Sequence, residues 1–180
     1  HDTFELRDDR DTNTVVPVGR IGSSDAETGL VSGYGSSRSA DGSSSQIIEF
    51  SKFEDVVVNL GATNAIFTVD DTLLPTVINA GSGNDVINIR KLSAATVLNL
   101  QDGDDIVNIQ GGGKLLNING GAQDKSLDLP DGGDRIILGS TRSFDGNVID
   151  VPVALNAIKI SGTGSARGSQ RFSTPDGTAP

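Results

Sequence analysis

The chain contains no cysteine and only one histidine, His1, among its 180 residues. Disulfides, thiolate nucleophiles and cysteine-based zinc sites are therefore excluded. With a single histidine and no phosphate-binding or nucleophile-elbow motif, catalytic-triad chemistry within this chain is excluded as well. Aromatic residues make up 4% of the chain and tryptophan is absent, so the core is expected to be aliphatic and thin.

Positive charge and long apolar runs are also scarce. The chain has 14 basic against 24 acidic residues, which gives a net charge of −10. Because phosphate binding needs clustered Lys and Arg, we expect no nucleic-acid partner. No apolar run approaches the roughly 20 residues of a membrane-spanning helix. The acidic balance suits cation binding and solubility outside cells, so we expect an extracellular or cell-surface protein.

What the sequence does contain is an internal repeat. Four coils of about 20 residues begin at Val56, Thr76, Thr96 and Leu115, the first reading VVVNLGATNAIFTVDDTLLP. Periods of this length are typical of stacked repeat architectures. Each coil holds two short runs in which apolar and polar residues alternate, which is the pattern of strands rather than helices. The repeat predicts an all-β fold, a parallel β-helix or β-solenoid with two main strands per coil.

Aligned coils place apolar residues above one another, about 4.8 Å apart, in four columns that we expect to face inward. The columns are Val58, Ile78, Leu98, Leu116; Leu60, Ala80, Leu100, Ile118; Phe67, Ile87, Val107, Leu127; and Val69, Ile89, Ile109, Leu129.

Two polar ladders alternate with these columns and should point outward. The first is Asn59, Asn79, Asn99 and Asn117, and the second is Thr68, Asn88, Asn108 and Asp128. Stacked side-chain amides at strand spacing can hydrogen-bond along the axis, which would be a structural role. The alternative is a regular polar surface that binds glycan, mineral or ice.

A further set of apolar residues also points outward by the same alternation. It comprises Val57, Val77 and Val97 on one strand and Val86 and Ile106 on the other. Strand propensity alone would account for these residues. If they form one large patch, something should cover it, and this makes them a possible assembly surface.

Composition divides the chain into four parts. We expect residues 1–22 to form a strand segment that packs on or continues a preceding repeat, because residues 1–11 resemble 124–134 in chemical type. Residues 23–46 are rich in Ser and Gly and read as a loop or linker. The solenoid should span 47–160, and the Gly/Ser/Pro-rich residues 161–180 read as a connector. This pattern favours one section of a longer tandem-repeat protein.

The turns between paired strands carry a recognisable motif. They read AGSGNDVIN from Ala80 and LQDGDDIVN from Leu100, with PDGGDRII from Pro130 as a looser third. These turns resemble the RTX, or haemolysin-type, repeat GGxGxDxUx of large secreted or surface proteins, with Gly81, Gly83, Asp85 and Ile87 matching in one coil. In the next coil Gly103, Asp105 and Val107 match.

The resemblance implies a parallel β-roll or β-helix with calcium held between successive turns. The possible ligands are Asp85, Asp102, Asp104 and Asp105, since calcium prefers six to eight oxygen ligands. This chain has one such turn per coil of about 20 residues, whereas the family has two in every 18. Turn chemistry alone also explains Gly, Asn and Asp at these positions, so both interpretations stay open.

These features bear on three functions. Paired acids, Asp70 with Asp71 and Asp104 with Asp105, could support glycoside hydrolysis, but turn chemistry explains each pair, so no enzyme is expected. The favoured hypothesis is a structural repeat unit of an extracellular fibre or surface protein, whose partners are copies of itself or neighbouring repeats. Neither end shows an evident capping helix, and an open sheet edge invites stacking. The alternative is a calcium-dependent adhesin or carbohydrate-binding module with glycan partners.

Overall fold

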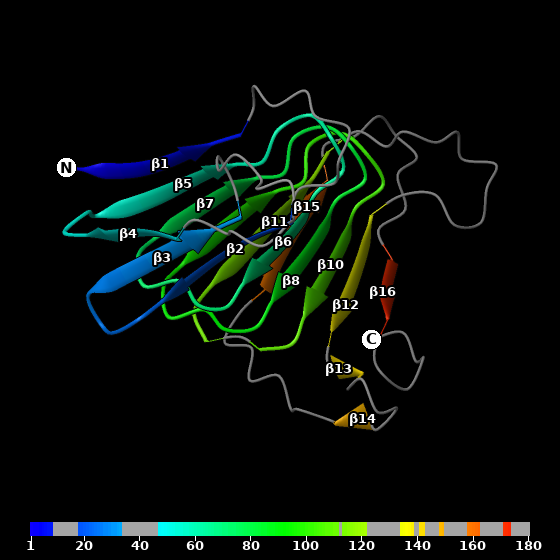
Figure 1. Ribbon diagram of the computed structural model, residues 1–180. Coiled ribbons are helices and arrows are strands. Elements are labelled where there is room, and N and C mark those ends of the chain that lie inside the picture. Colours follow the sequence, from blue (N-terminus) through cyan, green and yellow to red (C-terminus); the bar gives the residue numbers. More distant parts are fainter. Residues whose placement is uncertain are drawn as a thin grey trace, which may run out of the picture.

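Two largely parallel β-sheets face each other in the computed structural model (Figure 1). The structure describes residues 1–8, 18–33, 47–111, 113–121 and 134–138, together with the short strand segments 141–142, 148–149, 158–162 and 171–173. These residues contain no helix, and hence none that could cross a membrane. The predicted all-β, solenoid-like fold with two main strands per coil is confirmed.

Sheet A has six strands. In spatial order they are β1 (Thr3–Arg7), β5 (Asp55–Asn59), β7 (Thr76–Asn79), β9 (Thr96–Asn99), β11 (Leu116–Gly120) and β15 (Ile158–Gly162), all parallel.

Sheet B has eight strands. In spatial order they are β16 (Arg171–Ser173), β12 (Arg135–Leu138), β10 (Ile106–Ile109), β8 (Val86–Ile89), β6 (Ile66–Val69), β2 (Val18–Ser23), β3 (Thr28–Ser32) and β4 (Ile47–Ser51). The pairs from β16 to β2 are parallel, whereas β2–β3 and β3–β4 are antiparallel. A separate antiparallel pair joins β13 (Thr141–Arg142) to β14 (Val148–Ile149).

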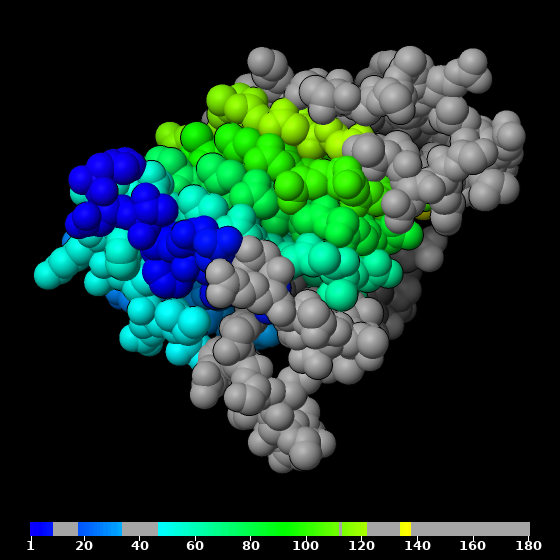
Figure 2. Space-filling model, turned by 90° about the horizontal axis from the view of Figure 1, so that it is seen from above, coloured from blue at the N-terminus to red at the C-terminus, as the bar shows by residue number. Residues whose placement is uncertain are grey.

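The coils stack with an offset of 20 residues through the central part of the chain. Val58 pairs with Ile78 and Ile78 with Leu98, while Phe67 pairs with Ile87 across sheet B. The space-filling view shows the coils as successive bands of colour in chain order (Figure 2). This constant offset places chemically equivalent residues one strand apart.

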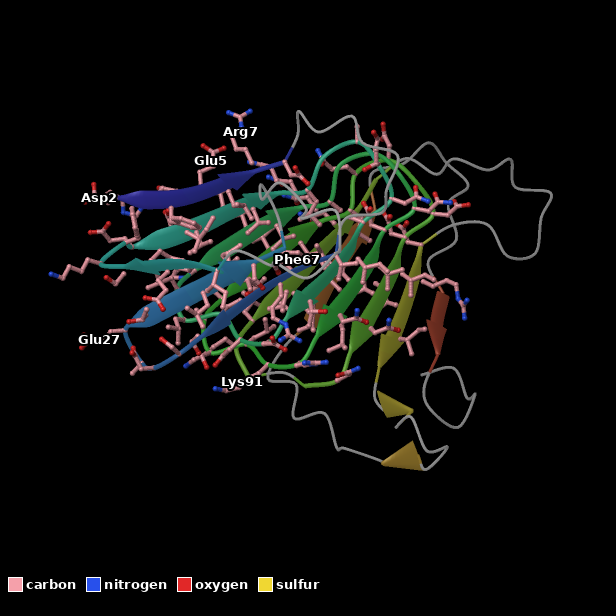
Figure 3. The ribbon with its side chains drawn as sticks, viewed as in Figure 1. Asp2, Glu5, Arg7, Glu27, Phe67 and Lys91 are labelled. Atoms are coloured by element: carbon pink, nitrogen blue, oxygen red, sulfur yellow. The ribbon has the colours of Figure 1, made fainter. Side chains whose placement is uncertain are left out.

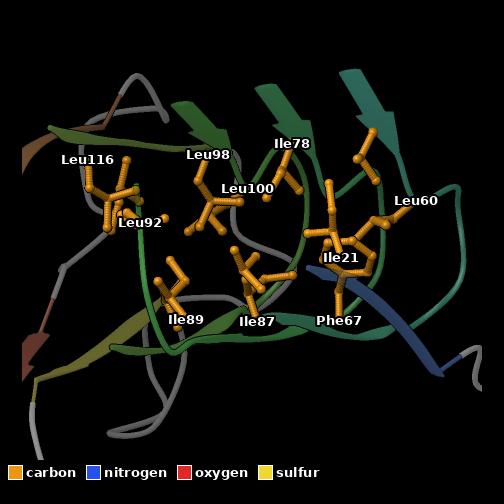
Figure 4. Close-up of a cluster of buried hydrophobic side chains, with 14 of the residues drawn as sticks. Ile21, Leu60, Phe67, Ile78, Ile87, Ile89, Leu92, Leu98, Leu100 and Leu116 are labelled. Carbon is orange, nitrogen blue, oxygen red and sulfur yellow. The ribbon is translucent and has the colours of Figure 1, made fainter. Parts of the chain in front are cut away.

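The core is a thin aliphatic layer between the sheets (Figure 4). Val58, Ile78 and Leu98 from sheet A, and Phe67 and Ile87 from sheet B, are 0% exposed. Fully burying a side chain of this size contributes about 1.5–3 kcal/mol. Each added coil therefore contributes a similar increment of hydrophobic stabilisation.

An antiparallel meander closes the N-terminal end of the solenoid. β3 and β4 extend sheet B beyond β2, and the Phe50 ring of β4 stacks on the Phe4 ring of β1 with centroids 4.3 Å apart. Phe53 completes the cluster, 5.7 Å from Phe4. Gly29 lies under Phe50, where a Cβ atom would lie 2.1 Å from the ring. This cover is made of strands, so it has no helical signature in the sequence, and β1 and β4 remain the terminal strands of their sheets.

The strand boundaries differ from the division expected from composition. β1 belongs to the solenoid through parallel pairing with β5, and β3 lies inside 23–46, which was expected to be a loop or linker. β16 lies inside the expected connector 161–180 and pairs with β12. The physical reason is that an adjacent sheet edge offers backbone hydrogen bonds even to segments poor in apolar residues.

The register of the last coil also differs from the expected alignment. Asn119, not Asn117, pairs with Asn99, and Ile118, not Leu116, pairs with Leu98. On sheet B, Ile137 pairs with Asn108, at the position expected for Asp128. Residues 122–133, which include Leu127, Asp128 and Leu129, lie outside the described residues.

Candidate functional site

An amide ladder runs along the outer face of sheet A. Asn79 donates from Nδ2 to Asn59 Oδ1, Asn99 donates to Asn79, and Asn119 donates to Asn99, each at 2.7 Å. Asn59 in turn donates to Glu5 Oε1 at 3.0 Å. The Asn59–Asn79–Asn99 part of the predicted ladder is present, and its fourth member is Asn119. Asn117 is half-buried, and its Oδ1 has no partner among the described residues.

The second predicted ladder is shorter. Asn108 donates from Nδ2 to Asn88 Oδ1 at 2.9 Å on the outer face of sheet B. Thr68 pairs with Asn88 in the strand register. The ladder is not continued by an amide beyond Asn108, because Ile137 occupies that register position.

Buried carboxylates stack inside the turns that lead from sheet A to sheet B, which we call the A-to-B turns (residues 60–65, 80–85 and 100–105). Asp85, Asp105 and Asp134 are 1%, 0% and 2% exposed. Asp85 Oδ1 accepts the Ala65 N–H at 2.7 Å, Asp105 Oδ1 accepts the Asp85 N–H at 2.8 Å, and Asp134 Oδ1 accepts the Asp105 N–H at 3.1 Å. Each carboxyl group thus satisfies the backbone of the preceding coil.

Two of these carboxyl groups have perturbed acidity. Burial raises the pKa of Asp85 to about 7 and that of Asp105 to about 8, since the charged form loses its hydration. Neighbouring acids, chiefly Asp85 and Asp134, raise the pKa of Asp105 further. The Oδ2 atoms of Asp85 and Asp105 are buried without a hydrogen-bond partner among the described residues.

A second set of side chains in the same turns accepts hydrogen bonds from the following coil rather than from the preceding one. Asn64 Oδ1 accepts the Asn84 N–H, and Asn84 Oδ1 accepts the Asp104 N–H, each at 2.9 Å. Adjacent coils are therefore joined by turn side chains that point both ways along the axis.

The four predicted calcium ligands do not share one environment. Asp85 and Asp105 are buried in the stack, Asp104 is half-buried, and Asp102 is exposed at the turn surface. Within the part of the chain that the structure describes, no three His, Cys, Asp or Glu side chains are grouped as metal ligands. Of the four, Asp85 and Asp105 accept hydrogen bonds from backbone N–H groups through their carboxyl groups.

The predicted assembly surface is divided between two faces. Val57, Val77 and Val97 are paired neighbours on the outer face of sheet A, whereas Val86 and Ile106 are neighbours on the outer face of sheet B. All five are half-buried. They form two narrow rows rather than one patch.

The acids weighed as a catalytic pair, Asp70 and Asp71, form ion pairs. Asp70 binds Arg20 at 2.8 Å and Arg90 at 2.7 Å, and Asp71 binds Lys91 at 2.5 Å. Asp71 also accepts hydrogen bonds from the Ser93 N–H and hydroxyl at 2.9 and 3.0 Å. These contacts join successive coils at the turns from sheet B back to sheet A.

A polar groove of about 650 Å³ lies where the amide ladder meets the A-to-B turns. Its walls include Glu5, Arg7, Asn79, Ser82, Gln101 and Asp102, so it crosses four coils. Glu5 and Arg7 project from the outer face of β1, away from the core residue Phe67 (Figure 3). Sequence reasoning missed this groove because its residues come from separate coils.

Two functional features had weak sequence signals. Asp134 lies within the looser third turn motif, but it joins the stack 29 residues after Asp105 rather than 20. Gln101 replaces the glycine found at the equivalent positions Gly61 and Gly81 and keeps a positive φ of 67°. That substitution is visible once the coils are aligned.

Together, the parallel sheets, the in-register apolar columns and the asparagine ladder define the class of this protein as a β-solenoid. Comparison of the chain with protein-family models, curated proteins and solved structures gives no significant match.

Proposed function

We propose that this chain is a non-enzymatic structural unit of an extracellular fibre or surface protein, in which stacked coils form an elongated rod. The observation that carries the proposal is the continuity of the asparagine ladder, which joins Asn59 to Asn119 through three bonds of 2.7 Å. The asparagine side chains of the ladder face outward and form hydrogen bonds between neighbouring coils. Such contacts between neighbouring coils stabilise a stacked repeat scaffold.

The environment of the acids supports a non-enzymatic role. Asp70 and Asp71 are held in ion pairs, and Asp85 and Asp105 accept backbone N–H groups. A catalytic carboxyl group must instead reach a substrate. Expected partners are copies of the chain or neighbouring repeats. At the N-terminal end, β1 and β4 are the terminal strands of sheets A and B.

A calcium-dependent adhesin is the second candidate. The observation that favours it is the pair of buried oxygens, Asp85 Oδ2 and Asp105 Oδ2, which have no partner in the described residues. A bound cation would replace the missing hydrogen bonds and hold both groups ionised. In this case the module would fold fully only when the metal is supplied.

Thermal unfolding in excess calcium and in excess EGTA separates the two candidates. For the structural unit we expect the same β-sheet circular dichroism and the same Tm in both solutions. Loss of the β-sheet signal in EGTA, restored by calcium, would overturn the structural proposal in favour of the second candidate. The Asp85→Asn/Asp105→Asn double variant should lose any calcium effect, whereas Glu49→Gln, which changes an exposed acid of β4, serves as the control.

A further inference from the structure

The groove across the A-to-B turns contains side chains that the fold itself does not use. Ser82, Gln101 and Asp102 are exposed on its rim, and their side chains make no hydrogen bond or ion pair within the described part of the chain. This contrasts with Asp85, Asp105, Asn64 and Asn84 in the same turns, which all hold neighbouring coils. The rim side chains are available to a ligand.

Gln101 is the most informative of these residues. It occupies a position at which the two preceding coils have Gly61 and Gly81, with φ values of 108° and 98°. Gln101 adopts the same left-handed region at 67° although its Cβ disfavours it. Glycine would fill this position with less strain, and strained backbone is typical of binding sites. The side chain that causes the strain lines the groove.

The chemistry of the groove selects a class of ligand. Gln101 offers amide donors and an acceptor, Ser82 offers a hydroxyl group, and Asp102 offers carboxylate acceptors, while Glu5 and Arg7 form an ion pair with each other in the lining. No aromatic residue is among the described residues that line it, which disfavours flat or apolar ligands. One arginine beside two acids does not suit a polyanion, and the net charge of −10 repels one.

The spacing of the groove selects the shape of the ligand. Neighbouring strands lie about 4.8 Å apart, so a groove that crosses four coils is about 14 Å long. The volume of about 650 Å³ lies in the range of small-molecule sites. A chain of pyranose rings linked in an extended form advances by a similar distance per ring and presents hydroxyl groups at each step.

We propose that this groove, centred on Gln101, binds an extended, neutral, β-1,4-linked polysaccharide along three or so sugar rings. The Gln101 amide and the Ser82 hydroxyl donate to and accept from the sugar hydroxyl groups, and Asp102 accepts from them. This role is independent of the structural proposal, since a rod with or without calcium can carry the groove.

The test is to titrate the full chain with cellohexaose and to monitor binding by the chemical shifts of backbone and side-chain amides in ¹H–¹⁵N NMR spectra. We expect shifts at Asn79, Ser82 and Gln101, with millimolar affinity because aromatic stacking is lacking. Maltohexaose, whose α-linkages coil the chain, should bind at least about tenfold more weakly. No shift with about 10 mM cellohexaose, a concentration that reveals millimolar binding, or equal binding of the two sugars, would overturn the proposal.

A pair of glycine variants separates binding from stability. Gln101→Gly removes the side chain and relieves the positive φ, so the protein should be as stable as the parent or more so, while cellohexaose affinity falls about tenfold. Lys52→Gly is the matched control, because Lys52 is the other described non-glycine residue with a positive φ, 66°, and lies outside the groove. Its sugar affinity should stay unchanged. Unchanged affinity in Gln101→Gly would contradict the proposed site.

Discussion

At the scale of single residues, the asparagine ladder makes the clearest energetic prediction. Asn79 both donates to Asn59 and accepts from Asn99, each at 2.7 Å. Replacing Asn79 with Ala removes both hydrogen bonds and should lower the free energy of unfolding by about 1–3 kcal/mol. Urea denaturation followed by circular dichroism measures this change.

Asn117 provides the matched control for that measurement. It lies on the same face as the ladder, but its Oδ1 has no partner among the described residues. Asn117→Ala should therefore cost far less than Asn79→Ala. Equal losses for the two variants would show that the ladder passes through Asn117 and that the register of β11 is shifted by two residues.

The buried Asp105 carboxyl group predicts an unusual dependence of stability on pH. Its pKa is about 8 in the folded protein, against 3.8 for an ordinary aspartate. The folded state therefore holds the proton more tightly, and this contribution is complete below pH 3.8 and is lost as the pH rises toward 8. Within that window one such group changes the free energy of unfolding by about 1.4 kcal/mol per pH unit.

Comparison with the Asp105→Asn variant separates the pH dependence due to Asp105 from that due to the other acidic residues. We expect the wild-type free energy of unfolding to fall by at least about 1 kcal/mol more than that of the variant between pH 5 and pH 8. Asp102→Asn, which changes an exposed acid of the same turn, should follow the wild-type curve. Parallel curves for wild type and Asp105→Asn would show that Asp105 is ionised throughout.

At the scale of elements, the N-terminal meander acts as a cap that depends on its aromatic cluster. Phe50 is 7% exposed and stacks on Phe4. Phe50→Ala should cost about 3–5 kcal/mol, the usual range for a buried phenylalanine. Hydrogen exchange should then show early loss of protection in β3 and β4, while β7 to β10 remain protected.

Opening of the β3–β4 meander would also expose the edge of β2. The Phe50→Ala protein should self-associate more than the parent in sedimentation velocity, because β2 would then become the edge strand of sheet B. Phe53→Ala is the milder comparison, since Phe53 is only half-buried. Uniform loss of protection across all strands would indicate that the meander and the coils unfold as one unit.

At the scale of the whole molecule, the constant offset of 20 residues predicts that one coil can be removed. Deletion of residues 76–95 joins Pro75 to Thr96, and β5 then meets β9 with Val58 beside Leu98 and Asn59 beside Asn99. The shortened chain should keep its β-sheet circular dichroism and lose stability in proportion to the lost coil.

A half-coil deletion provides the contrast. Removing residues 76–85 would connect a sheet A strand position to a sheet B strand, which places inward residues outward and breaks both sheets. That variant should fail to fold. If the full-coil deletion also failed to fold while the parent folded, the coils could not be independent stacking units.

The sequence by itself determined the solenoid. The alternation of apolar and polar residues fixed the strands, and the 20-residue period fixed the stacking of Val58, Ile78 and Leu98. These are properties of each residue and its counterpart in the next coil, so they can be read from local pattern alone. The first three members of the asparagine ladder followed from the same spacing.

Only the tertiary structure decided how the N-terminal end is covered and where the groove lies. The choice of Asn119 over Asn117, the entry of Asp134 into the carboxyl stack after 29 residues, and the fold of β3 and β4 over Phe4 all depend on backbone hydrogen bonds and ring contacts between distant segments. Both asparagines satisfy the outward alternation, and a chain insertion leaves no periodic trace. Pairing across the sheets, rather than local pattern, selects among such alternatives because buried backbone groups must be satisfied.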